Sequence, residues 1–266
     1  MSTINYEQIT RQVAALAKET GLYIKKSRQE ASIKTESKGK NDFVTQFDKE
    51  SEARIVKALG MILPEAGFIA EENTSQKQGV RYTWIIDPID GTTNFIHGLF
   101  PYCISIALME NQEIVSGVIY EAGLEECFTA WKGGPAQCNG TNIRVTDCAK
   151  VADSLIATGF PYSNFSLMEP FIRSLHYFMQ NSHGMRRLGS AAADLAYVAC
   201  GRFDAFYEYD LKPWDVAAGA FIVQQAGGKV CDFKGGSNYL FGREMIAGNA
   251  TLFNEFSTKV RSFLES

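Results

Sequence analysis

The sequence predicts a layered protein of helices and sheets (α+β to α/β), and two observations lead to this fold class. Apolar, strand-like runs separated by short turns follow residue 102, which is typical of an antiparallel sheet. After about residue 150, helical and strand-like patterns alternate, which favours a layered α/β arrangement. We therefore expect an N-terminal part, residues 1–149, and a C-terminal part, residues 150–266, packed into one compact unit.

Composition sets the outer limits. The chain has 266 residues with 45% hydrophobic content, so it can bury a large core without disulfides. A net charge of -4 and the lack of a long Lys/Arg block argue against general nucleic-acid binding. We expect a cytoplasmic protein without membrane spans, because no apolar run reaches about 18 residues and the N-terminus lacks a signal core. The six cysteines form no CxxC pair, which argues against a zinc site.

Helical periodicity opens the N-terminal part. Apolar residues at helical spacing predict an amphipathic helix over about residues 3–28, and a second one after Asp48. The polar, glycine-containing stretch 35–41 between them is predicted to be a loop. Residues 68–70 are predicted to form a short strand that ends in the pair Glu71-Glu72.

The later elements are predicted from apolar runs and from the turn and cap residues that bound them. The next strands are expected over 103–108, 114–120 and 126–131. In the C-terminal part Ser190 can cap a helix over 191–199, and Asp215 can cap one over 216–226. The remaining elements are strands over 155–159, 205–208, 229–233 and 245–248, a helix over 168–179 and a terminal helix.

The central stretch is the strand Trp84-Ile85-Ile86, which stops at Asp87 and Asp90. Two crowded carboxylates after a buried strand repel each other unless a cation lies between them. An Asx-type turn shaped by Pro88 is the alternative, but it leaves the second carboxylate and the threonines that follow unexplained. Oxygen ligands suit Mg²⁺, and the backbone and hydroxyls of Gly91-Thr92-Thr93 can bind phosphate.

Other candidate residues have equally ordinary explanations. Asp215 lies where a helix cap belongs, and its spacing leaves a cap and a metal ligand equally open. Asp48 can be a helix-start acid, and one residue of the Glu71-Glu72 pair can simply be exposed. Arg186-Arg187 can contact a phosphate, a partner subunit or solvent only.

The motifs as a set resemble the inositol monophosphatase family. The central signature is Asp87-Pro88-Ile89-Asp90-Gly91-Thr92-Thr93-Asn94-Phe95. Four further segments match in order: Asp42-Phe43-Val44-Thr45-Gln46-Phe47-Asp48, Ala70-Glu71-Glu72, Gly189-Ser190-Ala191-Ala192 with Glu208, and Trp214-Asp215-Val216-Ala217-Ala218-Gly219. The resemblance spans almost the whole chain.

The resemblance implies an α-β-α-β-α sandwich, the fructose-bisphosphatase/inositol monophosphatase-like sugar phosphatase fold. It implies a homodimeric, lithium-sensitive phosphomonoesterase that uses two to three Mg²⁺ ions, with a small phosphorylated polyol or sugar as substrate. Inositol 1-phosphate is the expected substrate. Fructose bisphosphate, a 3′-phosphoadenosine nucleotide, NADP or histidinol phosphate is the alternative, and so is a regulatory binding protein that retains the fold.

Site roles follow from the resemblance alone. Glu71, Asp87 and the Ile89 carbonyl would hold a first metal, and Asp87, Asp90 and Asp215 a second. Glu71 would also hold a third, weaker ion. Thr92 paired with Asp48 would activate water with help from Glu71, the Gly91 and Thr92 backbone would bind phosphate, and Asp90, Ala191 and Glu208 would contact substrate hydroxyls.

Two features leave the comparison open. The family has a lysine before its first acidic motif, and Lys38 and Lys40 both fit. Residues 160–163 lie where substrate contacts differ between members, so the resemblance does not identify the substrate.

Overall fold

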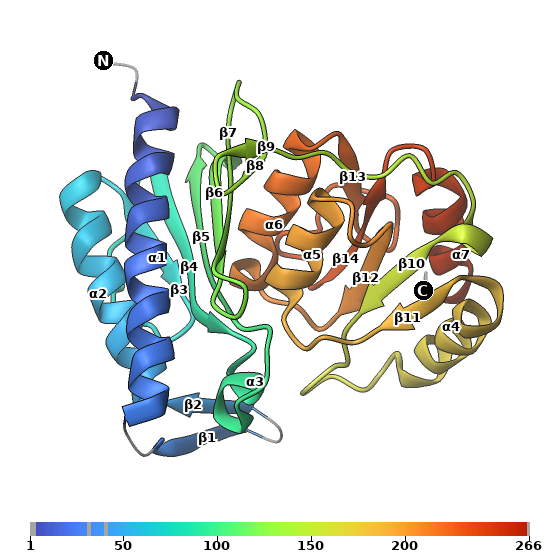
Figure 1. Cartoon of the computed structure of the whole chain (residues 1–266), viewed down its shortest axis with the longest axis horizontal. Coiled ribbons are helices and arrows are strands. Elements are labelled where there is room, and N and C mark those ends of the chain that lie inside the picture. The colour runs from blue at the N-terminus through green and yellow to red at the C-terminus, as the bar shows by residue number, and fades with distance from the viewer. Residues whose placement is uncertain (1–3, 31–32, 40–41, 265–266) are drawn as a thin grey trace.

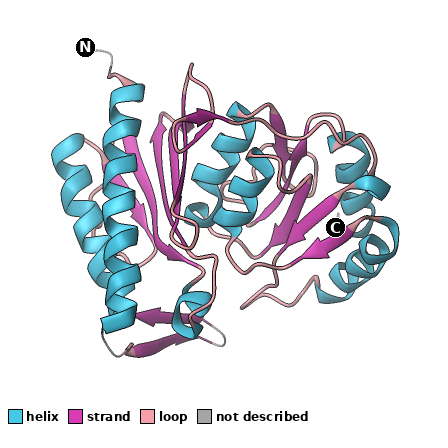
Figure 2. Ribbon diagram, viewed as in Figure 1, coloured by secondary structure: helices cyan, strands magenta, loops and turns pink. Residues whose placement is uncertain are grey.

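The elements stack as five layers. The computed structural model describes residues 4–30, 33–39 and 42–264. Helices α1 (Tyr6–Glu30) and α2 (Gln46–Ile62) cover one sheet, α5 (Ala191–Ala199) and α6 (Pro213–Gln225) separate it from a second, and α4 (Met168–Asn181) and α7 (Phe253–Leu264) cover the far side (Figures 1 and 2). This order confirms the predicted α-β-α-β-α fold class.

The first sheet has seven strands in the order β3-β4-β5-β6-β7-β8-β9. They are β3 (Gly67–Ala70), β4 (Tyr82–Asp90), β5 (Cys103–Glu110), β6 (Glu113–Glu121), β7 (Glu126–Trp131), β8 (Gln137–Cys138) and β9 (Thr141–Asn142). β3 runs parallel to β4, and the later neighbours are antiparallel. Trp84 and Ile86 pack in the core under α1 and α2, whereas Ile85 packs in the core around α5 and α6. Burial on both faces explains why this strand is apolar without alternation.

The second sheet has five strands in the order β11-β10-β12-β14-β13. They are β10 (Leu155–Thr158), β11 (Gly184–Arg186), β12 (Ala205–Tyr209), β13 (Gly228–Cys231) and β14 (Glu244–Asn249). β11 was not predicted, because three residues carry too little pattern. Helix α6 is buried all along Val216–Val223, as an apolar helix between two sheets must be. The division of the chain near residue 150 stays a prediction.

The hairpin that precedes α2 corrects the sequence reading. The stretch 35–41 was predicted as a loop, but β1 (Thr35–Gly39) pairs antiparallel with β2 (Asp42–Thr45). Backbone hydrogen bonds to the strand-forming Phe43-Val44-Thr45 form this pair, and they do not depend on apolar side chains in β1. Lys40 and Asn41 lie outside the described residues, and so does the side chain of Lys38.

Two short helices complete the chain, η1 (Val151–Asp153) and α3 (Thr92–His97). Helix α3 begins directly after β4 and brings the central signature to the lower ends of both sheets in Figure 1. Among the described residues, none of the helices combines the length and apolarity needed to cross a membrane.

Candidate active site

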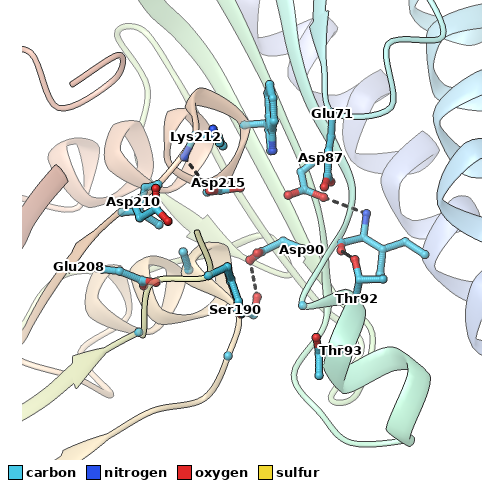
Figure 3. A pocket seen from close by; sticks show the side chains of 18 of the residues that line it. Glu71, Asp87, Asp90, Thr92, Thr93, Ser190, Glu208, Asp210, Lys212 and Asp215 are labelled. Atoms are coloured by element: carbon cyan, nitrogen blue, oxygen red, sulfur yellow. Dashed lines mark hydrogen bonds between the residues drawn. The ribbon is translucent and has the colours of Figure 1, made fainter. Parts of the chain in front are cut away.

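A cavity of about 310 Å³ opens where the two halves of the chain meet. Its wall takes β4 and α3 from the first half, and β12 and the starts of α5 and α6 from the second (Figure 3). The predicted site residues that line it are Glu71, Asp87, Ile89, Asp90, Gly91, Thr92, Ala191, Glu208 and Asp215. Asp48 lies behind the wall, fully buried, and reaches it through Thr92.

A bulge in β4 brings the two aspartates of the signature together. The strand was predicted to end at the two aspartates, and β4 runs through Asp87 and ends at Asp90. Asp87 pairs with Ser105 and Asp90 pairs with Cys103. Between these two pairs, β4 advances by three residues and β5 by two. In a regular strand, residues three apart point to opposite faces. The extra residue cancels this alternation, so both carboxylates reach one cavity.

Three carboxylates converge in the cavity. One oxygen each from Asp87, Asp90 and Asp215 lies within 4.8 Å of the others. Burial raises the pKa of Asp87 well above its usual value, and the charges of Glu71, Asp90 and Asp215 raise it further. Such crowding of like charges, with Asp87 buried and Asp90 and Asp215 half-buried, is unfavourable alone and favourable around a divalent cation. The all-oxygen donor set fits Mg²⁺.

Asp215 is held at the start of α6 in a way that spacing did not predict. The helix begins at Pro213, so Lys212 is the cap and Asp215 lies in the first turn. Its Oδ2 accepts the backbone N–H of Lys212 at 2.7 Å. Pro213 fits the first helical position because it has no N–H to leave unpaired. Burial, the main cause, and the Asp90 charge raise the pKa of Asp215 well above its usual value.

Asp90 joins the two halves of the site. Its Oδ2 accepts the Ser190 hydroxyl at 2.5 Å and the Ala192 backbone N–H at 2.7 Å, both at the start of α5. Ser190 also caps α5, as predicted, by accepting the N–H of Ala193. Burial raises the pKa of Asp90 to about 6, although the hydrogen bonds from α5 and the Arg187 charge oppose this rise.

Thr92 lies at the start of α3 beside the metal-ligand candidates. Its hydroxyl is 3.1 Å from Asp48 Oδ1 and 2.9 Å from the Ile89 carbonyl oxygen, so it can donate to either. Asp48 Oδ2 accepts the backbone N–H of Thr45 at 2.8 Å, which closes a capping box on α2. Gly91, between β4 and α3, has φ +92°, a conformation that favours glycine.

Glu71 follows β3 and lies beside Asp87 in Figure 3. Its backbone N–H donates to the Ile86 carbonyl at 3.3 Å, which continues the β3–β4 pairing by one step. Glu71 lies outside the tight group of three carboxylates, although its charge raises the pKa of Asp87. Its proposed roles as ligand and catalyst stay predictions.

Glu208 approaches the cavity from β12 on the side opposite Asp87 (Figure 3). A Cβ at Gly159 would lie within 2.2 Å of its carboxylate atoms, so only glycine leaves room for it there. Burial raises the pKa of Glu208 well above its usual value, and the Asp194 charge adds to this. A buried carboxyl at this place can exchange hydrogen bonds with hydroxyl groups of a bound molecule.

Several cavity residues were missed or left undecided by sequence reasoning. Both arginines are exposed, but Arg187 lines the cavity, whereas Arg186 lies outside its lining and donates to the Met185 carbonyl. The Arg187 guanidinium donates to the Tyr162 hydroxyl at 3.1 Å and lies 5.3 Å above the Phe160 ring. Arg186 is the last residue of β11 and Arg187 follows it, so only the path of the chain after this strand brings Arg187 to the cavity, and no local pattern separates the two arginines.

Comparisons with known proteins match most of the chain. The model of the inositol monophosphatase family matches residues 5–264. A putative Nus factor SuhB from Neisseria meningitidis serogroup B is 42% identical over 82% of this chain and 84% of its own. An inositol-1-monophosphatase from Mesorhizobium japonicum is 40% identical over 83% and 84%.

A solved structure has the same fold. The extragenic suppressor protein suhB from Bartonella henselae superposes with a TM-score of 0.89 at 35% identity, over 97% of this chain and 99% of that one. With the family model matched from end to end, the chain belongs to the inositol monophosphatase family.

Proposed function

We propose that the protein is a Mg²⁺-dependent, lithium-sensitive phosphatase of small phosphate monoesters, with inositol 1-phosphate as its substrate. The observation that carries this proposal is the convergence of Asp87, Asp90 and Asp215 within 4.8 Å beside the Thr92–Asp48 pair. The name of the Mesorhizobium relative supports the substrate. The homodimer implied by the resemblance remains part of the proposal.

The proposed metal ligands are residues of the cavity wall. Glu71, Asp87 and the Ile89 carbonyl would hold one Mg²⁺, and Asp87, Asp90 and Asp215 a second, with Glu71 reaching a third, weaker ion. When bound, the ions would neutralise the phosphate dianion and ease deprotonation of the attacking water. No nucleophilic Ser–His or Cys–His pair is part of this proposal, so water attacks phosphorus directly, in line with the leaving oxygen.

The protein groups then have separate tasks. Thr92, oriented by Asp48, accepts a hydrogen bond from the attacking water and so aligns its lone pair. The backbone of Gly91 and Thr92 would bind phosphate oxygens. Asp90, Ala191 and Glu208 would bind hydroxyls of the leaving group, which orients the scissile bond.

A panel of substrates tests the proposal. Phosphate release with Mg²⁺ should be fastest with inositol 1-phosphate, compared with fructose bisphosphate, a 3′-phosphoadenosine nucleotide, NADP and histidinol phosphate. Lithium should inhibit it by displacing one Mg²⁺. Good turnover of another compound without turnover of inositol 1-phosphate would refute the substrate. Absence of all turnover would favour a regulatory binding protein, the role suggested by the name of the Neisseria relative.

A second candidate substrate class is favoured by one observation. Arg187 and Lys212 line the cavity together with its many carboxylates. The Arg187 guanidinium already contacts the Tyr162 hydroxyl and the Phe160 ring, and these contacts favour one orientation of the side chain. A guanidinium at the cavity wall suits a second anionic group, such as the other phosphate of a bisphosphate.

Substitution of Arg187 separates the two classes. For a substrate with one phosphate, Arg187→Gln should change kcat/KM by less than about ten-fold, because the metal-ligand candidates remain. For a bisphosphate, it should raise KM by about ten- to a hundred-fold, because a charge-assisted hydrogen bond is lost. Arg186→Gln, on the neighbour outside the cavity lining, is the matched control. Equal effects of both substitutions on every substrate would contradict a role for Arg187.

A further inference from the structure

Glu52 is a buried carboxylate that the proposed mechanism does not use. It lies on α2 and is 0% exposed to solvent. Its Oε2 accepts the backbone N–H of Glu72 at 2.7 Å. Its Oε1 accepts both the backbone N–H and the hydroxyl of Thr74, each at 2.8 Å. Three donors therefore satisfy the two carboxylate oxygens, which is what a buried charge requires.

All three donors belong to the segment that directly follows Glu71. The N–H of Glu72 is part of the peptide group that begins with the Glu71 carbonyl. Because a peptide group is planar, a hydrogen bond to this N–H also fixes the backbone orientation on the C-terminal side of Glu71. On the other side, the N–H of Glu71 is held by Ile86 in the β4 strand. Glu71 is thus fixed between a strand and the Glu52 carboxylate.

The same helix serves Thr92. Asp48 and Glu52 are four residues apart on α2, so they lie on one face, one turn from each other. Asp48 contacts the Thr92 hydroxyl, and Glu52 contacts the Glu72–Thr74 backbone. Phe47, Ile55 and Leu59 anchor this helix in the core beneath β3 and β4. Helix α2 therefore fixes the position of Thr92 relative to the segment that follows Glu71.

We propose that Glu52 is a positioning residue, which holds the segment after β3 so that the Glu71 side chain reaches the metal site. This inference rests on the proposed function, since it takes Glu71 as a metal ligand. Glu52 touches neither metal nor substrate, and its effect passes through the peptide group between Glu71 and Glu72. Its signal in the sequence is a glutamate three residues before Ile55, within the apolar face of an amphipathic helix.

Glu52→Gln tests the proposal with little change of shape. The amide offers one acceptor oxygen, and its NH₂ group must then face a donor, so either the Glu72 or the Thr74 contact is lost. We expect Mg²⁺ binding without substrate, measured by calorimetry, to weaken about ten- to a hundred-fold. Amide exchange at Glu72 and Thr74 should accelerate, and kcat at subsaturating Mg²⁺ should fall more than KM for the substrate rises.

Two further variants keep the test decisive. Glu50→Gln removes a charge from an exposed position of the same helix and should leave Mg²⁺ affinity unchanged. Thr74→Val removes the hydroxyl that donates to Glu52 and leaves Glu52 itself in place. It should weaken Mg²⁺ binding by about two- to five-fold. This variant tests the proposal even if Glu52→Gln does not fold.

The outcomes separate this inference from the proposed function. If the wild-type protein binds no Mg²⁺, the proposed function fails, and the inference fails with it. If the wild type binds Mg²⁺, a folded Glu52→Gln variant with faster amide exchange and unchanged Mg²⁺ affinity overturns the inference alone. Should Glu52→Gln not fold, unchanged Mg²⁺ affinity in Thr74→Val overturns it. Weakened affinity in the folded variants, with an unchanged Glu50→Gln control, supports it.

Discussion

The Asp90→Asn variant is expected to lose phosphatase activity by about a thousand-fold or more while remaining folded. Asp90 belongs to the group of three carboxylates and also accepts hydrogen bonds from the start of α5. An asparagine can still accept the Ser190 hydroxyl and the Ala192 N–H through its one carbonyl oxygen. Its NH₂ group then replaces a charged oxygen toward the metal site. Turnover at saturating Mg²⁺ and far-UV circular dichroism measure the two effects separately.

A matched control makes this result specific. Asp147 is exposed and lies outside the cavity, so Asp147→Asn removes the same charge at a position that does not contact the site. It should keep activity within about two-fold of the wild type. Activity of Asp90→Asn within about ten-fold of the wild type would refute its role as a metal ligand.

Sequence reasoning reached the chemistry of the central signature, and the structure supplied its geometry. Adjacent carboxylates after a buried strand are a local pattern, so Asp87 and Asp90 could be predicted as a pair. The bulge could not, because it exists only in the register between β4 and β5. Likewise, the position of Asp215 within α6 depends on Pro213 and Lys212 as well as on its own preference for caps.

The residues that reach the site from distant parts of the chain could be identified only from the family resemblance or from the structure. Asp48 and Glu208 received their roles only through the family resemblance, since nothing in their spacing brings them to Asp90. Glu52 and Arg187 were not assigned roles, because each acquires its partners from other segments: Thr74 lies 22 residues from Glu52, and Tyr162 lies 25 from Arg187. The hairpin of β1 and β2 was missed for a different reason, because pairing between two consecutive segments outweighed the polar composition of β1.

The stability of the protein is expected to depend on pH and Mg²⁺ in opposite ways. The pKa of Asp90 is raised to about 6, and those of Asp87 and Asp215 are raised well above their usual values, mainly by burial. Between the ordinary and the raised pKa, the folded protein keeps protons that the unfolded chain has released. The metal-free protein therefore loses stability as pH rises through this range.

Magnesium should reverse this loss, because it binds the deprotonated carboxylates. At a concentration of about 100 times its dissociation constant, Mg²⁺ contributes about 2.7 kcal/mol. For a chain of this size, this corresponds to a rise of about 5–10 °C in Tm. The rise should be large near about pH 8 and small near about pH 5.5, where protons compete with the ion. Thermal melts with Mg²⁺ or with a chelator measure it, and an equal rise at both pH values would contradict the carboxylate cluster as the binding site.

The Asp90→Asn variant sharpens this prediction. A raised pKa means that the folded protein favours the neutral form of Asp90, and asparagine is permanently neutral. Without metal near pH 8, this variant should therefore melt at a higher temperature than the wild type, and Mg²⁺ should raise its Tm less. Ordinary loss of a structural hydrogen bond would lower the metal-free Tm instead. An inactive variant that is more stable without metal would show that the carboxylate is kept for binding the ion, at a cost to the fold.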